Sequence, residues 1–323
     1  MPPPALQAIG LRKSYRGGSG APSVQALDGL TFDTQRGTVL GMLGPNGAGK
    51  STTVKILATL SRSDTGEARV DGIDVARDPG AVRRRIGLVS QRPSSDPMAT
   101  GRENLVLAGR LHGMNRVDAA ARATDLMTRF GLADAADRLV RTWSGGMSRK
   151  LDVAIGLVNR PALLFLDEPT TGLDPEARAE LWGEIARLTR EDETTVLLTT
   201  HYLDEADRLA DVVAIVDQGR VRVQGSPDSL KAELRGDTIT LGLAGAPDGN
   251  AAIARVESVP GVVDVTLADG VLRARAEAGA RAVPLILAAL DQSGVDVARA
   301  TVARPSLDDV YLRHVGRAFE AVA

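Results

Sequence analysis

The chain has 323 residues, with 39 Lys and Arg against 41 Asp and Glu, a formal net charge of -2, and no cysteine. This length predicts about two domains, and the balanced charge makes nucleic acid an unlikely partner. Without cysteine there are no disulfides or thiolate metal sites, which fits a reducing cytoplasm, and His112, His201 and His314 are too few for a histidine-rich zinc site. No run approaches the ~20 apolar residues of a membrane span and the N-terminus lacks a secretory signal, so we expect membrane contact only through a partner.

The order of strand-like and helix-like stretches predicts an α/β fold. Two short strands, 8–15 and 29–33, flank a glycine-rich loop at 16–22. Strand-like runs at 38–43, 85–90, 163–167, 194–199 and 212–217 then alternate with helical stretches, which predicts a mainly parallel sheet flanked by helices. Residues 102–140 read as amphipathic helix broken at Gly113 and Gly131, and they indicate an inserted helical subdomain at about residues 100–158.

Residues 44–52 have the composition and placement of a phosphate-binding loop, between an apolar run and a helix-like segment. Glycines let successive backbone N–H groups turn toward an anion, and the start of the following helix adds further donors. We expect Lys50 to reach the β- and γ-phosphates and the Ser51 hydroxyl to bind Mg²⁺. A glycine-rich turn without function is the alternative. The loop comprises Gly44, Pro45, Asn46, Gly47, Ala48, Gly49, Lys50, Ser51 and Thr52.

The apolar strand at 163–167 ends in two carboxylates, Asp167 and Glu168. Ligands of open parallel sheets bind at the carboxyl ends of the strands, so both side chains are expected near the phosphate loop. Asp167 would help to hold Mg²⁺ through water, and Glu168 would act as the base that polarises an attacking water. A solvated acidic turn is the alternative interpretation.

Ser144, Gly145 and Gly146 precede a helix-like stretch and form a second anion receptor. One nucleotide cannot fill both receptors if the two loops are far apart. The pattern therefore indicates a homodimer in which each chain lends its Ser-Gly-Gly loop to the triphosphate held by the other. Alone, this tripeptide would be an ordinary turn and helix cap.

A domain boundary is predicted near residues 234–237, which gives a first domain at 1–235 and a second at 237–323. The second reads as β-α-β-β-α-β, with strands at 238–244, 262–267, 271–276 and 295–302 and helices at 250–259 and 280–293. This order predicts a small ferredoxin-like α+β module. It has no concentrated set of catalytic residue types, so regulation, dimer contact and ligand sensing all stay open.

The ordered motifs GPNGAGKST, Gln91, WSGGM, LLFLDEP, TGLDPEAR and TTHYLDEAD resemble the ATP-binding subunits of ABC transporters over nearly all of residues 6–234. The SGGM variant followed by basic residues, and the segment at 304–312, resemble the daunorubicin-resistance ATP-binding proteins and related drug exporters. The resemblance implies a P-loop NTPase fold of the ABC type, with ATP and Mg²⁺ bound between two copies of the chain.

The resemblance also implies roles for residues outside the phosphate loop. Tyr15 matches the aromatic residue that stacks on adenine, Gln91 the glutamine that senses Mg²⁺ and the attacking water, and His201 the histidine that contacts the γ-phosphate. Asp174 matches the aspartate that crosses the dimer interface, although by itself it reads as the cap of a helix starting at Pro175.

Two positions depart from the family pattern, with Trp143 where leucine is usual and Met147 where many members have glutamine. Neither changes the Ser-Gly-Gly receptor, but loss of the glutamine amide removes a hydrogen-bonding group.

The function that the resemblance implies is ATP hydrolysis that energises export of a hydrophobic drug or antibiotic. In the family the transport path lies in a separate membrane permease that docks near residues 91–100, so the chain would sit on the cytoplasmic side of the cell membrane. A soluble ABC-type ATPase working on ribosomes or DNA is the alternative, and a ligand-sensing binding module is a third hypothesis. A single cassette without a long coiled-coil or basic insert favours export.

Overall fold

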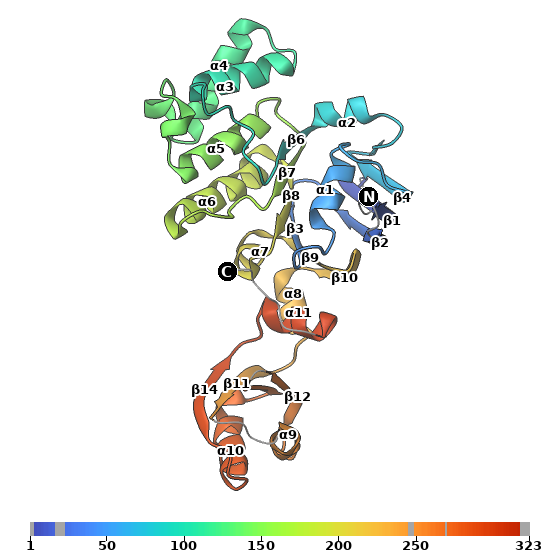
Figure 1. Ribbon diagram of the computed structural model, residues 1–323, viewed down its shortest axis with the longest axis vertical. Helices are drawn as coiled ribbons and strands as arrows, with labels where there is room; N and C mark the ends of the chain where they lie inside the picture. The colour runs from blue at the N-terminus through green and yellow to red at the C-terminus, as the bar shows by residue number, and fades with distance from the viewer. Residues whose placement is uncertain (1–2, 17–22, 245–248, 269, 317–323) are drawn as a thin grey trace. The chain divides into compact units, whose positions relative to one another are not determined.

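The computed structural model describes residues 3–16, 23–244, 249–268 and 270–316 (Figure 1). Most of the predicted glycine-rich loop at 16–22 lies outside these residues. The chain divides into two compact units, the first ending at Pro227 and the second beginning at Asp228. This division precedes the predicted boundary at 234–237. The intervening segment belongs to the second unit, where the Arg275 guanidinium donates to the Arg235 carbonyl at 2.6 Å.

The centre of the first unit is a six-stranded sheet in the order β10-β9-β3-β8-β7-β6. All its neighbouring pairs are parallel except β10 with β9, which confirms the predicted mainly parallel sheet. Residues of β3, β7 and β8 are buried throughout, as expected for strands covered on both faces. The strands are β3 (Val39–Leu43), β6 (Ile86–Val89), β7 (Leu163–Asp167), β8 (Thr195–Thr200), β9 (Val212–Asp217) and β10 (Arg220–Gly225).

An antiparallel sheet in the order β2-β1-β4-β5 packs beside it in the first unit. Its leucines share one apolar core with α1 (Lys50–Leu57), the helix that follows the phosphate loop. The strand predicted at 29–33 is longer in the structure, and the short β5 and the helix α2 (Pro79–Arg85) were not predicted. The strands are β1 (Leu6–Tyr15), β2 (Val24–Thr34), β4 (Thr65–Val70) and β5 (Ile73–Asp74).

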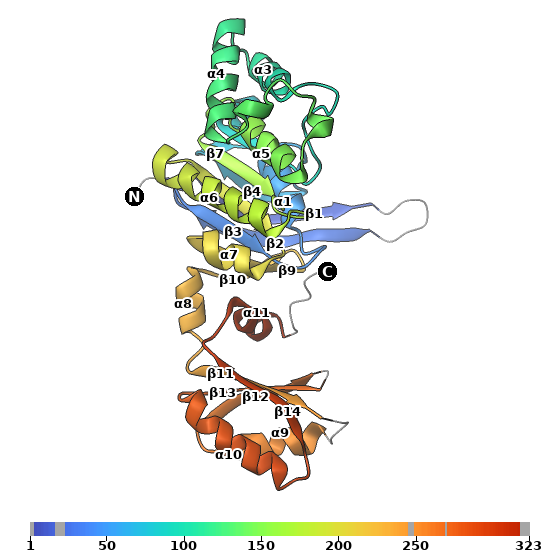
Figure 2. The ribbon, with the colours of Figure 1, turned by 90° about the vertical axis from the view of Figure 1, so that its left-hand side faces the viewer.

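The inserted subdomain contains α3 (Gly101–Leu111) and α4 (Arg116–Arg129), which lie side by side in Figures 1 and 2, together with α5 (Gly145–Gly156). Gly131 adopts a φ of 66° just after α4, so the predicted helical run stops there. Residues beyond it form only the short 3₁₀ turns η1 (Ala133–Ala135) and η2 (Val140–Thr142). Trp143 is buried in the core of this subdomain. Its ring packs so closely against Gly101 that a Cβ there would lie 2.3 Å from it.

The second unit has four antiparallel strands in the order β12-β13-β11-β14, which confirms the predicted ferredoxin-like module. Helices α9 (Gly249–Glu257) and α10 (Gly279–Asp291) cover one face of this sheet, and α11 (Leu307–Val315) lies on the other (Figure 2). Neither α11 nor the short α8 (Pro227–Ala232) was predicted as a helix. The strands are β11 (Asp237–Leu243), β12 (Val262–Ala268), β13 (Val271–Ala276) and β14 (Val297–Ala303).

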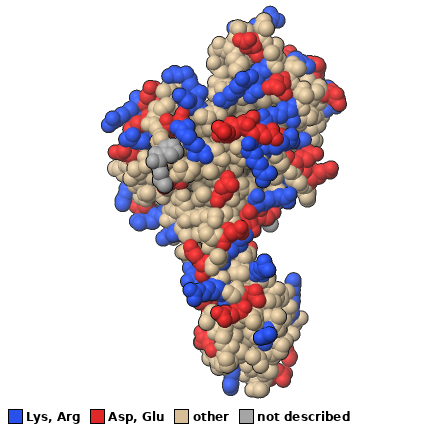
Figure 3. All heavy atoms as spheres, turned by 180° about the vertical axis from the view of Figure 1, so that it is seen from behind, with Lys and Arg blue, Asp and Glu red and all other residues tan. Residues whose placement is uncertain are grey.

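Charged side chains of both signs lie intermixed over the face shown in Figure 3, in keeping with the formal net charge of -2. Across the described parts of the chain, every helix is too short or too polar to cross a membrane.

One carboxylate of the first unit is fully buried. Glu205 lies in α7 (Leu203–Leu209), and its Oε1 accepts hydrogen bonds from Thr170 Oγ1 at 2.9 Å and from Trp182 Nε1 at 3.0 Å. The Trp182 ring belongs to α6 (Pro175–Asp192), so this carboxylate joins two helices and the turn after β7. Burial raises the pKa of Glu205, and the hydrogen bonds that it accepts oppose this rise.

Replacing Glu205 by Gln tests this burial cost. Because the folded pKa is raised, stability contributed by the neutral carboxyl is present below the unfolded-chain pKa and is lost as the pH rises through the folded pKa. The amide keeps both accepted hydrogen bonds without that loss. We expect the difference between the melting temperature of E205Q and that of the native chain, measured by calorimetry, to increase in favour of E205Q from pH 5 to pH 8. Glu176→Gln, at an exposed position of α6, should melt with the same pH dependence as the native chain. If E205Q also melted with that pH dependence, the raised pKa of Glu205 would be contradicted.

Candidate functional site

The phosphate loop connects β3 to α1, and close contacts with the surrounding backbone hold it. Gly49 caps α1 with a φ of 109°, and a Cβ there would lie 2.6 Å from the Ala26 carbonyl oxygen. A Cβ at Gly44 would lie 2.2 Å from the Val216 carbonyl oxygen. Only glycine fits at these positions, so the loop is pressed against β2 on one side and β9 on the other.

A cavity of about 390 Å³ opens beside this loop, within the range of small-molecule sites. It brings together segments that are far apart in the sequence, since the exposed ring of Tyr15, the Gln91 side chain and Glu168 all reach it. The lining residues are Tyr15, Val24, Ala26, Asn46, Gly47, Ala48, Gly49, Lys50, Ser51, Thr52, Gln91 and Glu168.

Lys50 is folded into the loop with its side chain only 4% exposed. Its ammonium donates to the carbonyl oxygens of Gly44 at 2.7 Å and Pro45 at 3.1 Å, and lies 3.8 Å from Glu168 Oε1. Burial lowers the pKa of Lys50, whereas the negative charges of Glu168 and Asp167 raise it. The loop therefore already contains the cation that an anionic ligand would need.

Ser51 and Asp167 meet at the carboxyl ends of the strands. Ser51 Oγ donates to Asp167 Oδ1 at 3.1 Å, and Thr199 Oγ1 donates to the same oxygen at 2.6 Å. Hydroxyl and carboxylate oxygens are the ligands that Mg²⁺ prefers, and it usually completes its shell with water and phosphate oxygens. The pair fits such an ion, and no group of three or more His, Cys, Asp or Glu able to hold a metal occurs among the described residues.

The Glu168 carboxylate is the point at which the predicted catalytic side chains converge. Gln91 Nε2 donates to its Oε2 at 3.2 Å, and His201 Nδ1 lies 3.3 Å from the same oxygen. Lys50 approaches the other carboxylate oxygen, and the Glu168 side chain is only 9% exposed. A carboxylate, a cation and two polar side chains thus surround one small volume beside the phosphate loop.

The backbone of Glu168 is strained, with a φ of 49° in the left-handed region. Its N–H donates to both the carbonyl and the hydroxyl oxygen of Thr199, each at 3.1 Å. These bonds fix the direction in which the side chain leaves the strand. Thr199 was not predicted as a functional residue, because a threonine at the end of a buried strand is common.

Arg149 is the second residue that sequence analysis missed. It lies in α5 and is only 8% exposed. Its guanidinium donates to the carbonyl oxygens of Ser90 at 2.7 Å, Pro169 at 2.7 Å and Glu168 at 3.3 Å. Burial lowers the pKa of Arg149, and neighbouring carboxylates raise it. One side chain therefore ties α5 to the segments that carry Gln91 and Glu168.

Asp152, one turn further along α5, holds the loop that follows Gln91. Its buried Oδ1 accepts from the backbone N–H groups of Ser94 and Ser95, at 3.0 and 3.1 Å, and from the Ser94 hydroxyl. The loop at 91–100 and the turn that contains Glu168 are thus both anchored to α5.

The Ser-Gly-Gly loop does not line the cavity. Ser144 caps α5 by accepting from the Met147 N–H at 3.2 Å, and Asp174 caps α6 by accepting from the Ala177 N–H at 2.9 Å. A Cβ at Gly146 would lie 2.8 Å from the Ala177 Cβ, so the starts of the two helices touch. Ser144 and Asp174 are exposed and form a separate, neighbouring surface.

Two family models match the chain. Residues 27–171 match the ABC transporter family, and residues 225–315 match the C-terminal domain of ATP-binding proteins like DrrA1-3.

Curated relatives extend the similarity over the whole chain. It is 47% identical to the daunorubicin resistance ATP-binding protein DrrA3 of Streptomyces coeruleorubidus, over 90% of this chain and 92% of that protein. It is 46% identical to the daunorubicin/doxorubicin resistance ATP-binding protein DrrA of Streptomyces peucetius, over 98% and 93%. The linearmycin resistance ATP-binding protein LnrL of Bacillus subtilis is 32% identical, over 97% and 98%.

Solved structures are similar to the first unit. The dimeric structure of a post-hydrolysis state of an ATP-binding cassette, bound to ADP and phosphate, has a TM-score of 0.62 and 25% identity over 68% of this chain and 98% of that one.

Arg149→Lys should separate positioning from nucleotide binding. A lysine ammonium has its donors on a single atom and lacks the planar fork that reaches the separated carbonyl oxygens of Ser90, Pro169 and Glu168, so Glu168 loses one of its supports while the phosphate loop is unchanged. We expect kcat for ATP hydrolysis to fall about tenfold while the ATP dissociation constant changes less than about twofold. Single-turnover hydrolysis and fluorescent nucleotide titration measure the two quantities. The control is Arg141→Lys, at an exposed arginine of the same subdomain, and an equal loss of binding and turnover in R149K would indicate a merely structural role.

Proposed function

Because the chain belongs to the daunorubicin-resistance ATP-binding proteins, a family of ABC transporter ATPase subunits, we propose that it energises export of a hydrophobic antibiotic or drug through a separate membrane permease. The names of the relatives support this class of cargo, since they confer resistance to daunorubicin, doxorubicin or linearmycin. The observation that carries the catalytic part is the convergence of Lys50, Gln91 and His201 on the Glu168 carboxylate beside the phosphate loop.

In the proposed reaction, water attacks the γ-phosphorus of ATP in line with the bond to the β-phosphate oxygen, which breaks as ADP leaves. Glu168 accepts the proton of that water, and Gln91 and His201 fix its direction of approach. Lys50 exchanges its bonds to the loop carbonyls for bonds to the β- and γ-phosphates. Mg²⁺, held by Ser51 and Asp167, would neutralise charge on the phosphate oxygens. Tyr15 stacks on the adenine.

We propose that two copies of the chain complete each site. Ser144 and Gly145 are exposed at the start of α5, Gly146 is partly buried beside them, and none of the three lines the cavity of its own chain. In a head-to-tail dimer they would bind the γ-phosphate held by the partner, and Asp174 would cross the interface between the two sites. Interface energy then depends on an intact triphosphate, so hydrolysis weakens the closed state. The dimeric cassette bound to ADP and phosphate supports this arrangement.

We propose that residues 91–100 bind the permease, which would place the chain on the cytoplasmic side of the cell membrane. The hydrogen bonds of Asp152 with Ser94 and Ser95 tie this loop to α5. A displacement of this loop would therefore move α5 and, through the Arg149 guanidinium, the backbone of Glu168. The contact couples the permease mechanically to the hydrolysis site.

Replacing Glu168 by Gln tests the assigned base. The amide keeps the volume of the side chain but cannot take the proton of water. Turnover should fall about 10²-fold or more while ATP affinity is retained. Because the triphosphate then survives, we expect E168Q to accumulate as an ATP-bound dimer in light scattering. Undiminished hydrolysis by E168Q with magnesium present would exclude Glu168 as the base.

Mixing two inactive variants tests the shared site. Lys50→Ala disables the phosphate loop and Ser144→Arg disables the receptor of the other site. In a mixed dimer, the S144R chain contributes an intact phosphate loop and the K50A chain an intact Ser-Gly-Gly loop, so one complete site forms. Mixing in equal amounts should restore ATPase activity that neither variant has alone. If both loops acted on a nucleotide within one chain, mixing would restore nothing.

A further inference from the structure

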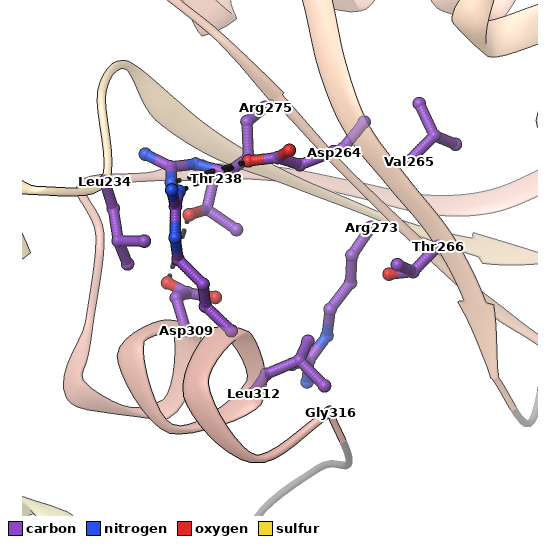
Figure 4. A pocket seen from close by; sticks show the side chains of 12 residues that line it. Leu234, Thr238, Asp264, Val265, Thr266, Arg273, Arg275, Asp309, Leu312 and Gly316 are labelled. Atoms are coloured by element: carbon purple, nitrogen blue, oxygen red, sulfur yellow. Dashed lines mark hydrogen bonds and ion pairs between the residues drawn. The ribbon is translucent and has the colours of Figure 1, made fainter. Parts of the chain in front are cut away.

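The second unit contains a cavity of about 290 Å³ that plays no part in the ATP site. It lies between α11 and the face of the sheet that α9 and α10 do not cover (Figure 4). Its walls combine the apolar side chains of Leu234 and Leu312 with several charged groups. The volume is at the lower end of the range for small-molecule sites.

A β-bulge shapes one wall of this cavity. The register of β12 against β13 shifts between Val263 and Thr266, and Asp264 within the shift has a φ of 54°. Bulges redirect side chains, and left-handed non-glycine residues are strained. Here the Asp264 carboxylate comes within 3.9 Å of the Arg275 guanidinium and 3.8 Å of that of Arg313.

Most charged groups around the cavity are already engaged by the protein. Arg275 is 7% exposed and donates to the carbonyl oxygens of Arg235 and Gly236. Asp309 accepts from the Thr238 hydroxyl at 3.0 Å and forms the capping box at the start of α11. These groups build the walls and have little capacity left for a ligand.

Arg273 is different. It follows the same face of β13 as Arg275, is half-buried, and extends toward Leu312 (Figure 4). Within the described part of the chain its guanidinium makes no hydrogen bond or ion pair. Asp308, just outside the cavity, is close enough for Arg273 to lower its pKa, although burial raises that pKa more. A planar cation thus faces a ligand-sized space, with Asp308 as a charged neighbour but with no hydrogen bond or ion pair to the described residues.

We propose that this cavity binds a small amphiphilic carboxylate. The ligand's carboxylate would pair with the fork of the Arg273 guanidinium, whose two parallel N–H groups match its two oxygens. Its apolar part would lie against Leu312 and Leu234. The guanidinium carries one positive charge and has the Asp308 carboxyl nearby, which favours a monoanion over a phosphate dianion.

Titration of the full chain with octanoate, octanol and octylamine tests this proposal, since the three probes share one chain and differ in charge. Isothermal calorimetry should show octanoate binding about tenfold more tightly than octanol, and octylamine more weakly than either. Arg273→Met keeps the aliphatic packing without the charge, and it should lower octanoate affinity about tenfold while leaving octanol affinity unchanged. The matched control, Arg281→Met, removes an exposed arginine of α10 and should change nothing.

Thr266→Phe gives a second readout, because its ring would fill the cavity and should abolish binding of octanoate and octanol alike. Circular dichroism and melting temperature establish that each variant is folded. Octanoate binding that is undetectable in the native chain, unchanged in R273M, or matched by octylamine would overturn the proposal. The measurement records binding alone, so its outcome is independent of ATP hydrolysis.

Discussion

The bonds that the Arg149 guanidinium donates to backbone carbonyls are the constraint on which the proposed hydrolysis site depends. They join the end of β6, the strained turn after β7 and the helix that starts at Ser144. A buried guanidinium is stable only when its donors are satisfied, so these segments hold one another in place. The backbone of Glu168 takes its direction from this arrangement and from Thr199, and Gln91, His201 and Lys50 surround the carboxylate itself.

Much of the first unit could be predicted because its signals are local. Glycines, a lysine and a hydroxyl between a strand and a helix specify a phosphate loop, and an apolar strand ending in Asp167 and Glu168 specifies a sheet edge. Arg149 and Thr199 gave no such signal, because their importance comes from backbone atoms that are distant in sequence. The extra length of β2 was also missed, since it pairs with β1 across a loop that composition alone marks as irregular.

The second unit shows the same division between local and non-local information. Alternation of apolar residues predicted its four strands and the helices α9 and α10, because each of these elements presents one apolar face to a common core. Helix α11 was not predicted, although Ser306 and Asp309 form its capping box. The cavity beside it could not be predicted, because it depends on a register shift at Asp264 that no pattern in β12 announces.

Helix α5 has a consequence for how the two subunits of the proposed ATP-bound dimer communicate. Its cap, Ser144, faces outward, whereas Arg149 lies about 7.5 Å further along the axis and touches the turn of Glu168. A helix this short and well packed moves as a rigid body. Binding of ATP by one subunit would therefore shift the turn of Glu168 in the other, so that the rate of hydrolysis at one site would depend on the nucleotide at the other.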